Sequence, residues 1–242
     1  MHWKELLTTS RLFGKYESRA TYYNAYIQDK NWAAWELGEV PTEEVERLFL
    51  FLKQWGMQFL PVGTEAISGF QKGYSKVHKL LKEMGDVKLE TIDLCTQAEG
   101  GLSNTQVIAE IFNGMACCFG NNKRESTAAS KILHTMCPDL FVMWDSDICW
   151  YGYQLLGGGY QYANYFLPRM QKEALFGINE YAQEKECTQT ETIECITSLA
   201  KAPSFTKLLD EWNYCRFNRK MRRRVEDGEG RNLDEILTES VE

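Results

Sequence analysis

The chain lacks long apolar runs, and no segment of its 242 residues is apolar enough to span a bilayer. Its first residues also lack the charged and then apolar pattern of a secretory signal peptide. These absences argue against a membrane protein and against a secreted one. We therefore expect a cytoplasmic protein whose thiols remain reduced.

Histidine is scarce, and no two cysteines have the spacing that is typical of a metal or redox site. The chain has three histidines and eight cysteines, and none of the cysteines form the C-x-x-C pair that is common in zinc and redox sites. Several cysteines lie inside apolar runs, where a reduced thiol packs as a small hydrophobic group. The sequence therefore predicts no metal site and no cofactor.

Alternating apolar and polar residues, which would indicate β-strands, are almost absent. Instead, apolar residues recur at spacings of three and four, as Val45, Leu48 and Leu52 do after the helix start signal Pro41-Thr42. We therefore predict an all-α fold. The predicted helices span residues 16–30, 42–56, 65–84, 104–118, 127–136, 147–155, 160–185, 189–200 and 204–224.

Charge is unevenly distributed along the chain. The net charge is −7, and residues 225–242 carry seven acids against one arginine, which leaves residues 1–224 at −1. We therefore predict one all-α domain at 1–224, followed by an acidic, disordered tail at 225–242. No sustained heptad repeat is present, so we expect a monomer.

A basic segment precedes the tail, with six basic residues among positions 215–224. Such a local surface can bind phosphates whatever the charge of the whole chain, although a solvated terminal helix is the alternative.

Residues 104–148 form a unit in which two predicted helices flank a turn and lead to an aspartate. The sequence reads as a helix at 104–118, a turn at 120–125, a second helix at 127–136 and an apolar segment that ends at Asp145. Asp145 or Ser146 is placed to cap the helix that follows. Spacing in the second helix predicts a buried stripe of Ala129, Ile132, Leu133 and Met136, and a polar face of Thr127, Ser130, Lys131 and His134.

This arrangement resembles the helix-hairpin-helix DNA glycosylase superfamily. Trp144-Asp145-Ser146-Asp147-Ile148 is similar to that family's aspartate motif, and Ser130-Lys131-Ile132 resembles the segment that carries its lysine. The chain departs from the family pattern in having Thr127 and Ala129 where hairpin glycines are usual, and in the short spacing between Lys131 and Asp145. The resemblance implies a helix-hairpin-helix glycosylase-like bundle, with the motif at about 104–137.

The resemblance also implies two catalytic residues, Asp145 and Lys131. Cleavage of an N-glycosidic bond builds positive charge on the sugar, which a carboxylate such as that of Asp145 stabilises while it orients water. Lys131 would form a Schiff base with the sugar, or else contact a phosphate. The simpler alternatives are that Asp145 only caps a helix and that Lys131 is a solvated charge, with Asp147 as the fallback carboxylate.

DNA contacts are expected from the turn, from the second helix and from the basic segment. Exposed backbone N–H groups and cations of a turn suit phosphates. For His134, a structural role in the core is the alternative. The candidates are Asn121, Asn122, Lys123, Arg124, His134, Arg219, Arg222 and Arg223.

A base taken out of the stack must be held between aromatic or apolar walls. Aromatic residues are dense on both sides of Gly157-Gly158-Gly159, although core packing explains them equally well. The candidate base-pocket residues are Trp144, Trp150, Tyr153 and Gln161.

The leading hypothesis is a metal-free DNA glycosylase that removes a modified base. It would act in base-excision repair or in defence against phage DNA with hypermodified bases such as glucosylated hydroxymethylcytosine. One alternative is a non-catalytic helix-hairpin-helix module that binds nucleic acid, with strongly salt-sensitive affinity. Another is an all-α adaptor between proteins.

Overall fold

The computed structural model describes residues 1–241 except 30–34, 36–37, 62, 95–100 and 120–124. The described residues contain helices and no strand, which confirms the predicted all-α class. The helices are α1 (Trp3–Tyr16), α2 (Ala20–Asp29), α4 (Thr42–Gln54), α5 (Thr64–Glu83), α6 (Asn104–Ala116), α7 (Ser126–Met136), η1 (Ile148–Gly152), α8 (Gly159–Gln161), η2 (Tyr162–Phe166), α9 (Leu167–Lys185), α10 (Gln189–Ala200), α11 (Phe205–Phe217), α12 (Arg219–Glu229) and α13 (Leu233–Val241), where η1 and η2 are π-helical turns.

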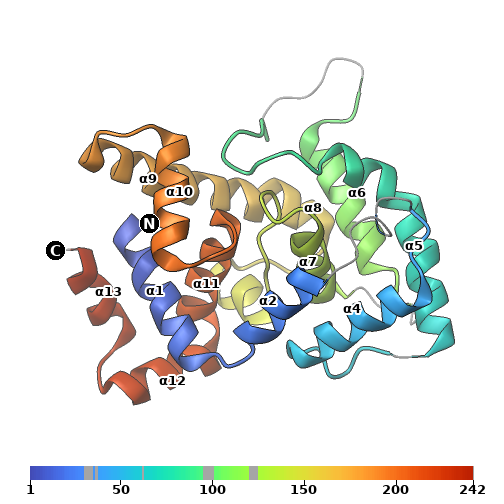
Figure 1. Ribbon diagram of the computed structural model, residues 1–242, viewed down its shortest axis with the longest axis horizontal. Coiled ribbons are helices and arrows are strands. Elements are labelled where there is room, and N and C mark those ends of the chain that lie inside the picture. The colour runs from blue at the N-terminus through green and yellow to red at the C-terminus, as the bar shows by residue number, and fades with distance from the viewer. Residues whose placement is uncertain (30–34, 36–37, 62, 95–100, 120–124, 242) are drawn as a thin grey trace.

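The helices form two groups that lie side by side (Figure 1). In the terminal group, α1 packs on α10, α11, α12 and α13, so both ends of the chain lie in the same group. In the central group, α2 packs on α4, α4 on α5, α5 on α6, and α6 on α7. The two groups face each other across the segment that leads from α7 to α9.

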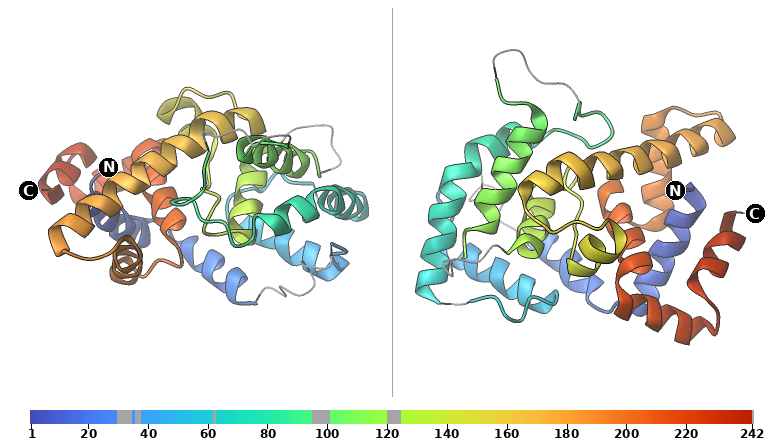
Figure 2. Two further views of the ribbon diagram at one scale, coloured as in Figure 1. Left: turned by 90° about the horizontal axis from the view of Figure 1, so that it is seen from above. Right: turned by 180° about the vertical axis from the view of Figure 1, so that it is seen from behind.

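The long helix α9 connects the two groups. Its start continues from α8 and η2, which pack on α6, and its remainder packs on α1, α10 and α11 (Figure 2). Pro168, the second residue of α9, follows the helical backbone of η2, so it removes one backbone N–H from a continuous helical run. The larger hydrophobic core of the described residues therefore extends through both groups, and a second, smaller core joins α1, α11, α12 and α13.

The predicted pair of helices at 104–118 and 127–136 is confirmed as α6 and α7, which pack against each other. A capping box starts α6, in which Ser103 Oγ accepts from the Gln106 N–H and Gln106 Oε1 accepts from the Ser103 N–H. The tip of the connection between α6 and α7, residues 120–124, lies outside the described residues.

An apolar segment without regular structure, residues 140–144, runs through the core to Asp145. Each of its side chains is at most 1% exposed. Side chains satisfy its buried backbone, since the Tyr162 hydroxyl donates to the Val142 carbonyl and the Trp144 N–H donates to Ser130 Oγ. Ser130 is therefore fully buried rather than on the predicted polar face.

The structure corrects the expected chain ends. The predicted disordered tail at 225–242 is wrong, because α12 continues to Glu229 and α13 packs on α1 through the buried Leu233 and Leu237. Those leucines supply enough apolar surface to order an acidic segment. The predicted single helix at 204–224 is divided at Asn218, and α1 was not predicted.

Candidate functional site

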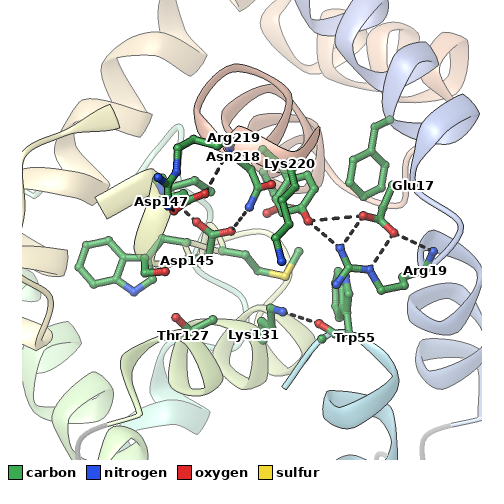
Figure 3. A pocket seen from close by; sticks show the side chains of 18 of the residues that line it. Glu17, Arg19, Trp55, Thr127, Lys131, Asp145, Asp147, Asn218, Arg219 and Lys220 are labelled. Carbon is green, nitrogen blue, oxygen red and sulfur yellow. Dashed lines mark hydrogen bonds and ion pairs between the residues drawn. The ribbon is translucent and has the colours of Figure 1, made fainter. Parts of the chain in front are cut away.

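A cleft of about 1080 Å³ opens between the terminal and central groups, and Asp145 and Lys131 both line it. Its walls come from the end of α1, the end of α4, α7, the start of η1, α11 and α12. Figure 3 shows Asp145 and Arg19 on opposite sides, with Lys131 below and between them. The structure thus brings the two predicted catalytic residues into one cavity.

Asp145 is held by two hydrogen bonds at the start of η1. Its Oδ1 accepts from the Ile148 N–H at 2.8 Å, as the predicted capping role requires, and its Oδ2 accepts from Asn218 Nδ2 at 2.9 Å. Burial raises the pKa of this carboxyl above its usual value, although both hydrogen bonds and nearby Lys131 act in the opposite direction. The carboxylate is therefore fixed in place and more basic than an ordinary aspartate.

Lys131 extends from α7 to the end of α4. Its Nζ donates to the Trp55 carbonyl oxygen at 2.7 Å and lies 5.2 Å from the centre of the Trp55 ring. Burial lowers the pKa of this ammonium to about 8, against the opposing attraction of Asp145 and Asp210. A lysine with this pKa has a larger neutral, nucleophilic fraction at neutral pH than a solvated one.

The basic residues of α12 form one rim of the cleft. Arg219, Lys220, Arg223 and Arg224 all line it and are exposed. The Arg219 N–H donates to Asp147 at 3.2 Å, and the Arg219 guanidinium lies over the Tyr151 ring at 4.5 Å. Among the described residues, Lys220 and Arg223 have no ion-pair partner within 4.0 Å, so this rim can receive phosphates.

A polar network of Glu17, Arg19 and Tyr214 forms the wall opposite Asp145. Arg19 Nε donates to Glu17 Oε1 at 2.7 Å, and Arg19 Nη2 donates to the Tyr214 hydroxyl at 2.6 Å. Arg224 lies 3.6 Å from the same Glu17 carboxylate. Glu17 is 2% exposed, so its charge is compensated by two arginines in a fixed arrangement.

A buried ion cluster lies beside this wall. Lys207 Nζ is 2.9 Å from Asp210 Oδ2 and 3.1 Å from Glu211 Oε1, and it lies 4.3 Å from the centre of the Phe13 ring. Lys207 is 2% exposed. Asp210 and Phe13 also line the cleft, so the cluster supports its inner surface.

His134 is not at the cleft, which corrects its prediction as a DNA contact. It is completely buried, with Nε2 2.8 Å from the Tyr23 hydroxyl and Nδ1 2.7 Å from the Phe141 carbonyl oxygen. The alternative, a structural histidine, is the role that these contacts indicate. It holds α2 and the buried segment 140–144 against α7.

Stability should decrease in mild acid because of His134. Burial lowers the pKa of its ring to about 3, so the native state keeps it neutral while the unfolded chain binds a proton below about pH 6.5. The contribution is complete above that pH and is lost as the pH falls toward 3, by roughly 1.4 kcal/mol per pH unit. Urea unfolding between pH 7.5 and 5 measures this slope.

The matched variants are His134→Gln and His78→Gln. We expect the first to be less stable at neutral pH and to show a flatter pH dependence, while the second keeps the wild-type slope. A wild-type slope in His134→Gln would show that other groups cause the acid sensitivity.

The other predicted DNA contacts divide into three sets. Arg219 and Arg223 line the cleft. Arg222 lies outside the cleft on another face of α12, where it donates to Glu226 Oε1 at 2.9 Å and to Asp234 Oδ2 at 2.7 Å. Four candidates lie outside the described residues: Asn121, Asn122, Lys123 and Arg124.

Only one of the four predicted base-pocket residues lines the cleft. Trp144 does so, although it is 1% exposed and packs on Phe112 and Tyr162. The Tyr153 hydroxyl instead donates to Asn213 Oδ1 at 2.5 Å.

Gln161 and Trp150 are also outside the cleft. Gln161 Oε1 accepts from the Leu156 N–H, and Trp150 is 57% exposed on the surface of η1. The aromatic residues that suggested a base pocket are divided between the core, where Tyr162 and Phe166 are buried, and the surface, where Trp150, Tyr151, Tyr160 and Tyr165 are exposed.

Sequence reasoning missed the cleft residues that lie far from Asp145 and Lys131 in the sequence. Glu17, Arg19, Trp55 and Tyr214 belong to no motif, and they meet only because the terminal and central groups pack together. Asn218 did leave a signal. Asparagine favours helix N-caps, and Asn218 Oδ1 accepts from the Met221 N–H at the start of α12.

The described part of the chain lacks two further features. No described helix has the length and apolarity needed to cross a membrane. Within the same residues, no three histidine, cysteine, aspartate or glutamate side chains gather in a way that could hold a metal ion.

Comparisons of the chain with models of protein families, with curated proteins and with solved structures found no match.

Proposed function

We propose that this protein is a DNA N-glycosylase that receives an everted base in the cleft and hydrolyses its glycosidic bond with Asp145. The observation that carries the proposal is the position of Asp145, a partly desolvated carboxylate in a large cleft whose rim is formed by exposed cations of α12. A helix cap alone requires neither the cleft nor the cations.

The reaction would need little more than this carboxylate and water. As the bond between the base nitrogen and the anomeric carbon breaks, its electron pair leaves with the base, and the sugar becomes positively charged. Asp145 stabilises that charge, accepts a hydrogen bond from the attacking water and takes its proton as the new carbon–oxygen bond forms. Its raised pKa favours proton acceptance.

DNA would be positioned by its phosphates along α12. Lys220 and Arg223 are available for such contacts, and Arg219 extends the rim toward Asp147. A cleft of about 1080 Å³ is ample for an everted nucleotide, including one with a bulky substituent. The proposal therefore includes both damaged bases of repair and hypermodified bases of phage DNA.

Lys131 would add a second step if it attacks the sugar. Its neutral amine would form an imine with the anomeric carbon of the opened abasic sugar, with loss of water, and the imine promotes strand cleavage by elimination. The lowered pKa of Lys131 and its place beside Asp145 support this role. Its bond to the Trp55 carbonyl oxygen would have to break first.

The test is a base-release assay with duplex and single-stranded oligonucleotides that carry a panel of damaged and phage-type modified bases. Mass spectrometry detects the freed base, and alkali converts abasic sites to strand breaks. Base release by wild type that is lost in Asp145→Asn would support the proposal. The variant, purified in the same way, also controls for a contaminating enzyme. Strand breaks that wild type produces before alkali is added, and that Lys131→Gln does not produce, would assign the strand-cleavage step to Lys131.

Two other results would redirect the assignment. DNA binding without base release across the panel would support a non-catalytic nucleic-acid-binding module. Absence of binding even at low salt would contradict both and support a protein adaptor.

A further inference from the structure

Arg19 has a fixed guanidinium in the cleft that the hydrolytic step does not use. Glu17 holds its Nε and Nη2, and the Tyr214 hydroxyl also accepts from Nη2. The Arg19 side chain keeps 30% of its surface exposed, while Glu17 keeps 2%. The arginine is therefore oriented from behind by its partners and remains accessible from the cleft.

The remaining nitrogen, Nη1, packs against the backbone of Gly56. A Cβ placed on Gly56 would lie 2.4 Å from Nη1, so a side chain there would displace the guanidinium, and the φ of +91° at Gly56 favours glycine. Within the described residues, Nη1 makes no hydrogen bond. Two N–H donors thus lie at the cleft wall without an acceptor in the part of the chain that the structure describes.

Arg19 faces Asp145 across the cleft (Figure 3). A nucleoside whose anomeric carbon meets Asp145 would extend its base toward the wall formed by Arg19 and Tyr214. A guanidinium only donates hydrogen bonds, so it accepts a carbonyl oxygen as partner and rejects an amino group at the same place.

We infer that Arg19 recognises a carbonyl oxygen on the edge of the everted base, so that the substrate is a carbonyl-bearing base rather than its amino analogue. The inference rests on the proposed function, because it places the base by means of Asp145. It assigns Arg19 to specificity, with Glu17, Tyr214 and Gly56 as its positioning residues.

A phosphate is the competing ligand for any arginine, but the surroundings of Arg19 favour a neutral acceptor. Its charge is compensated by the buried Glu17, which weakens its long-range attraction for anions and leaves its directional donors unchanged. The exposed α12 cations Lys220 and Arg223 lie at the rim, where a DNA backbone would pass.

The test compares two isosteric pairs of bases, hypoxanthine with adenine and uracil with cytosine. Each base is placed opposite an abasic gap, which lowers the cost of eversion. Fluorescence anisotropy measures affinity in the Asp145→Asn background, where base release is expected to be slow. We expect the carbonyl member of each pair to bind on the order of tenfold tighter.

Three variants assign the preference to Arg19. Arg19→Lys keeps the charge but loses the planar fork, and Tyr214→Phe removes one partner of that fork, so both should reduce the preference. Arg223→Ala is the matched control and should weaken all four oligonucleotides equally, with a shallower salt dependence. Thermal unfolding verifies that each variant is folded.

Equal affinities within each pair would overturn the inference. A uniform loss in Arg19→Lys across all four oligonucleotides would also overturn it, because Arg19 would then contact a group that they share, such as a phosphate. Wild-type base release is measured on the same oligonucleotides together with the modified panel. If the carbonyl base binds more tightly but no base is released, the proposed hydrolysis is contradicted and the recognition by Arg19 is retained. If bases are released but both members of a pair bind equally, only the recognition by Arg19 is contradicted.

Discussion

Asp145→Asn is expected to slow base release by at least about a hundredfold, the range found when one electrostatic stabiliser of a transition state is removed. The amide keeps an oxygen that can accept from the Ile148 N–H, so the start of η1 should persist, while the bond from Asn218 Nδ2 is lost. It cannot supply negative charge to the sugar or take a proton from water. Single-turnover kinetics with saturating protein isolate this chemical step from binding and product release.

Asp147→Asn is the matched control, because Asp147 lies two residues away and contacts Arg219 rather than facing Lys131. We expect it to change the rate only a few-fold. DNA affinity should be unchanged or higher in Asp145→Asn, since a negative charge has been removed near phosphates. Equal losses in the two variants would mean that the mutations disturb the start of η1 instead of the chemistry.

The pH dependence of the rate of base release is a second test of Asp145. Hydrolysis requires ionised Asp145, so the rate should fall as the pH decreases through its pKa. Because burial raises that pKa, the fall should begin at a higher pH than for a solvated aspartate. A flat profile through the acid range would contradict the role as general base.

Lys207→Met is expected to lower the free energy of unfolding by about 3–5 kcal/mol, the usual effect of removing one partner from a buried ion pair. Asp210 and Glu211 are 6% and 8% exposed, and both would lose the ammonium that compensates them. Protonation of one carboxylate would relieve part of this loss. Chemical denaturation at neutral pH measures the change.

Lys201→Met is the control for the loss of a lysine charge, because Lys201 is exposed at the end of α10. It should change stability by no more than about 0.5 kcal/mol. Adding Asp210→Asn and Glu211→Gln to Lys207→Met should recover part of the stability, since the unpaired charges are then removed. A free energy of unfolding for Lys207→Met equal to that of wild type would contradict the stabilising role of the buried ion cluster.

The sequence predicted what depends on local spacing. The helical period identified α4, α5, α6 and α7 closely, and the preference of aspartate for helix starts placed Asp145 as a cap. The sequence could not identify features that depend on pairing between distant segments. The acidic tail was predicted to be disordered because its few leucines stabilise a helix only when they are buried against α1, and the local sequence does not show that contact.

The same limit explains the errors at the candidate site. A helical wheel of α7 cannot show that the segment at 140–144 covers its polar side, so Ser130 and His134 appeared exposed. Similarly, the spacing of α12 shows a basic surface but cannot show which face α13 occupies. That contact holds Arg222 beside Asp234, while Arg223 remains at the cleft.

The hydrogen bond between Asn218 and Asp145 joins residues 73 positions apart, and this has a consequence for how the protein is made. During synthesis, Asp145 and α7 leave the ribosome well before α11 and α12 exist. Until then, the carboxylate lacks one of its two partners, and the cleft lacks the basic rim. The site is therefore completed late in translation, so under the proposed function a nascent chain would not yet bind DNA or release a base.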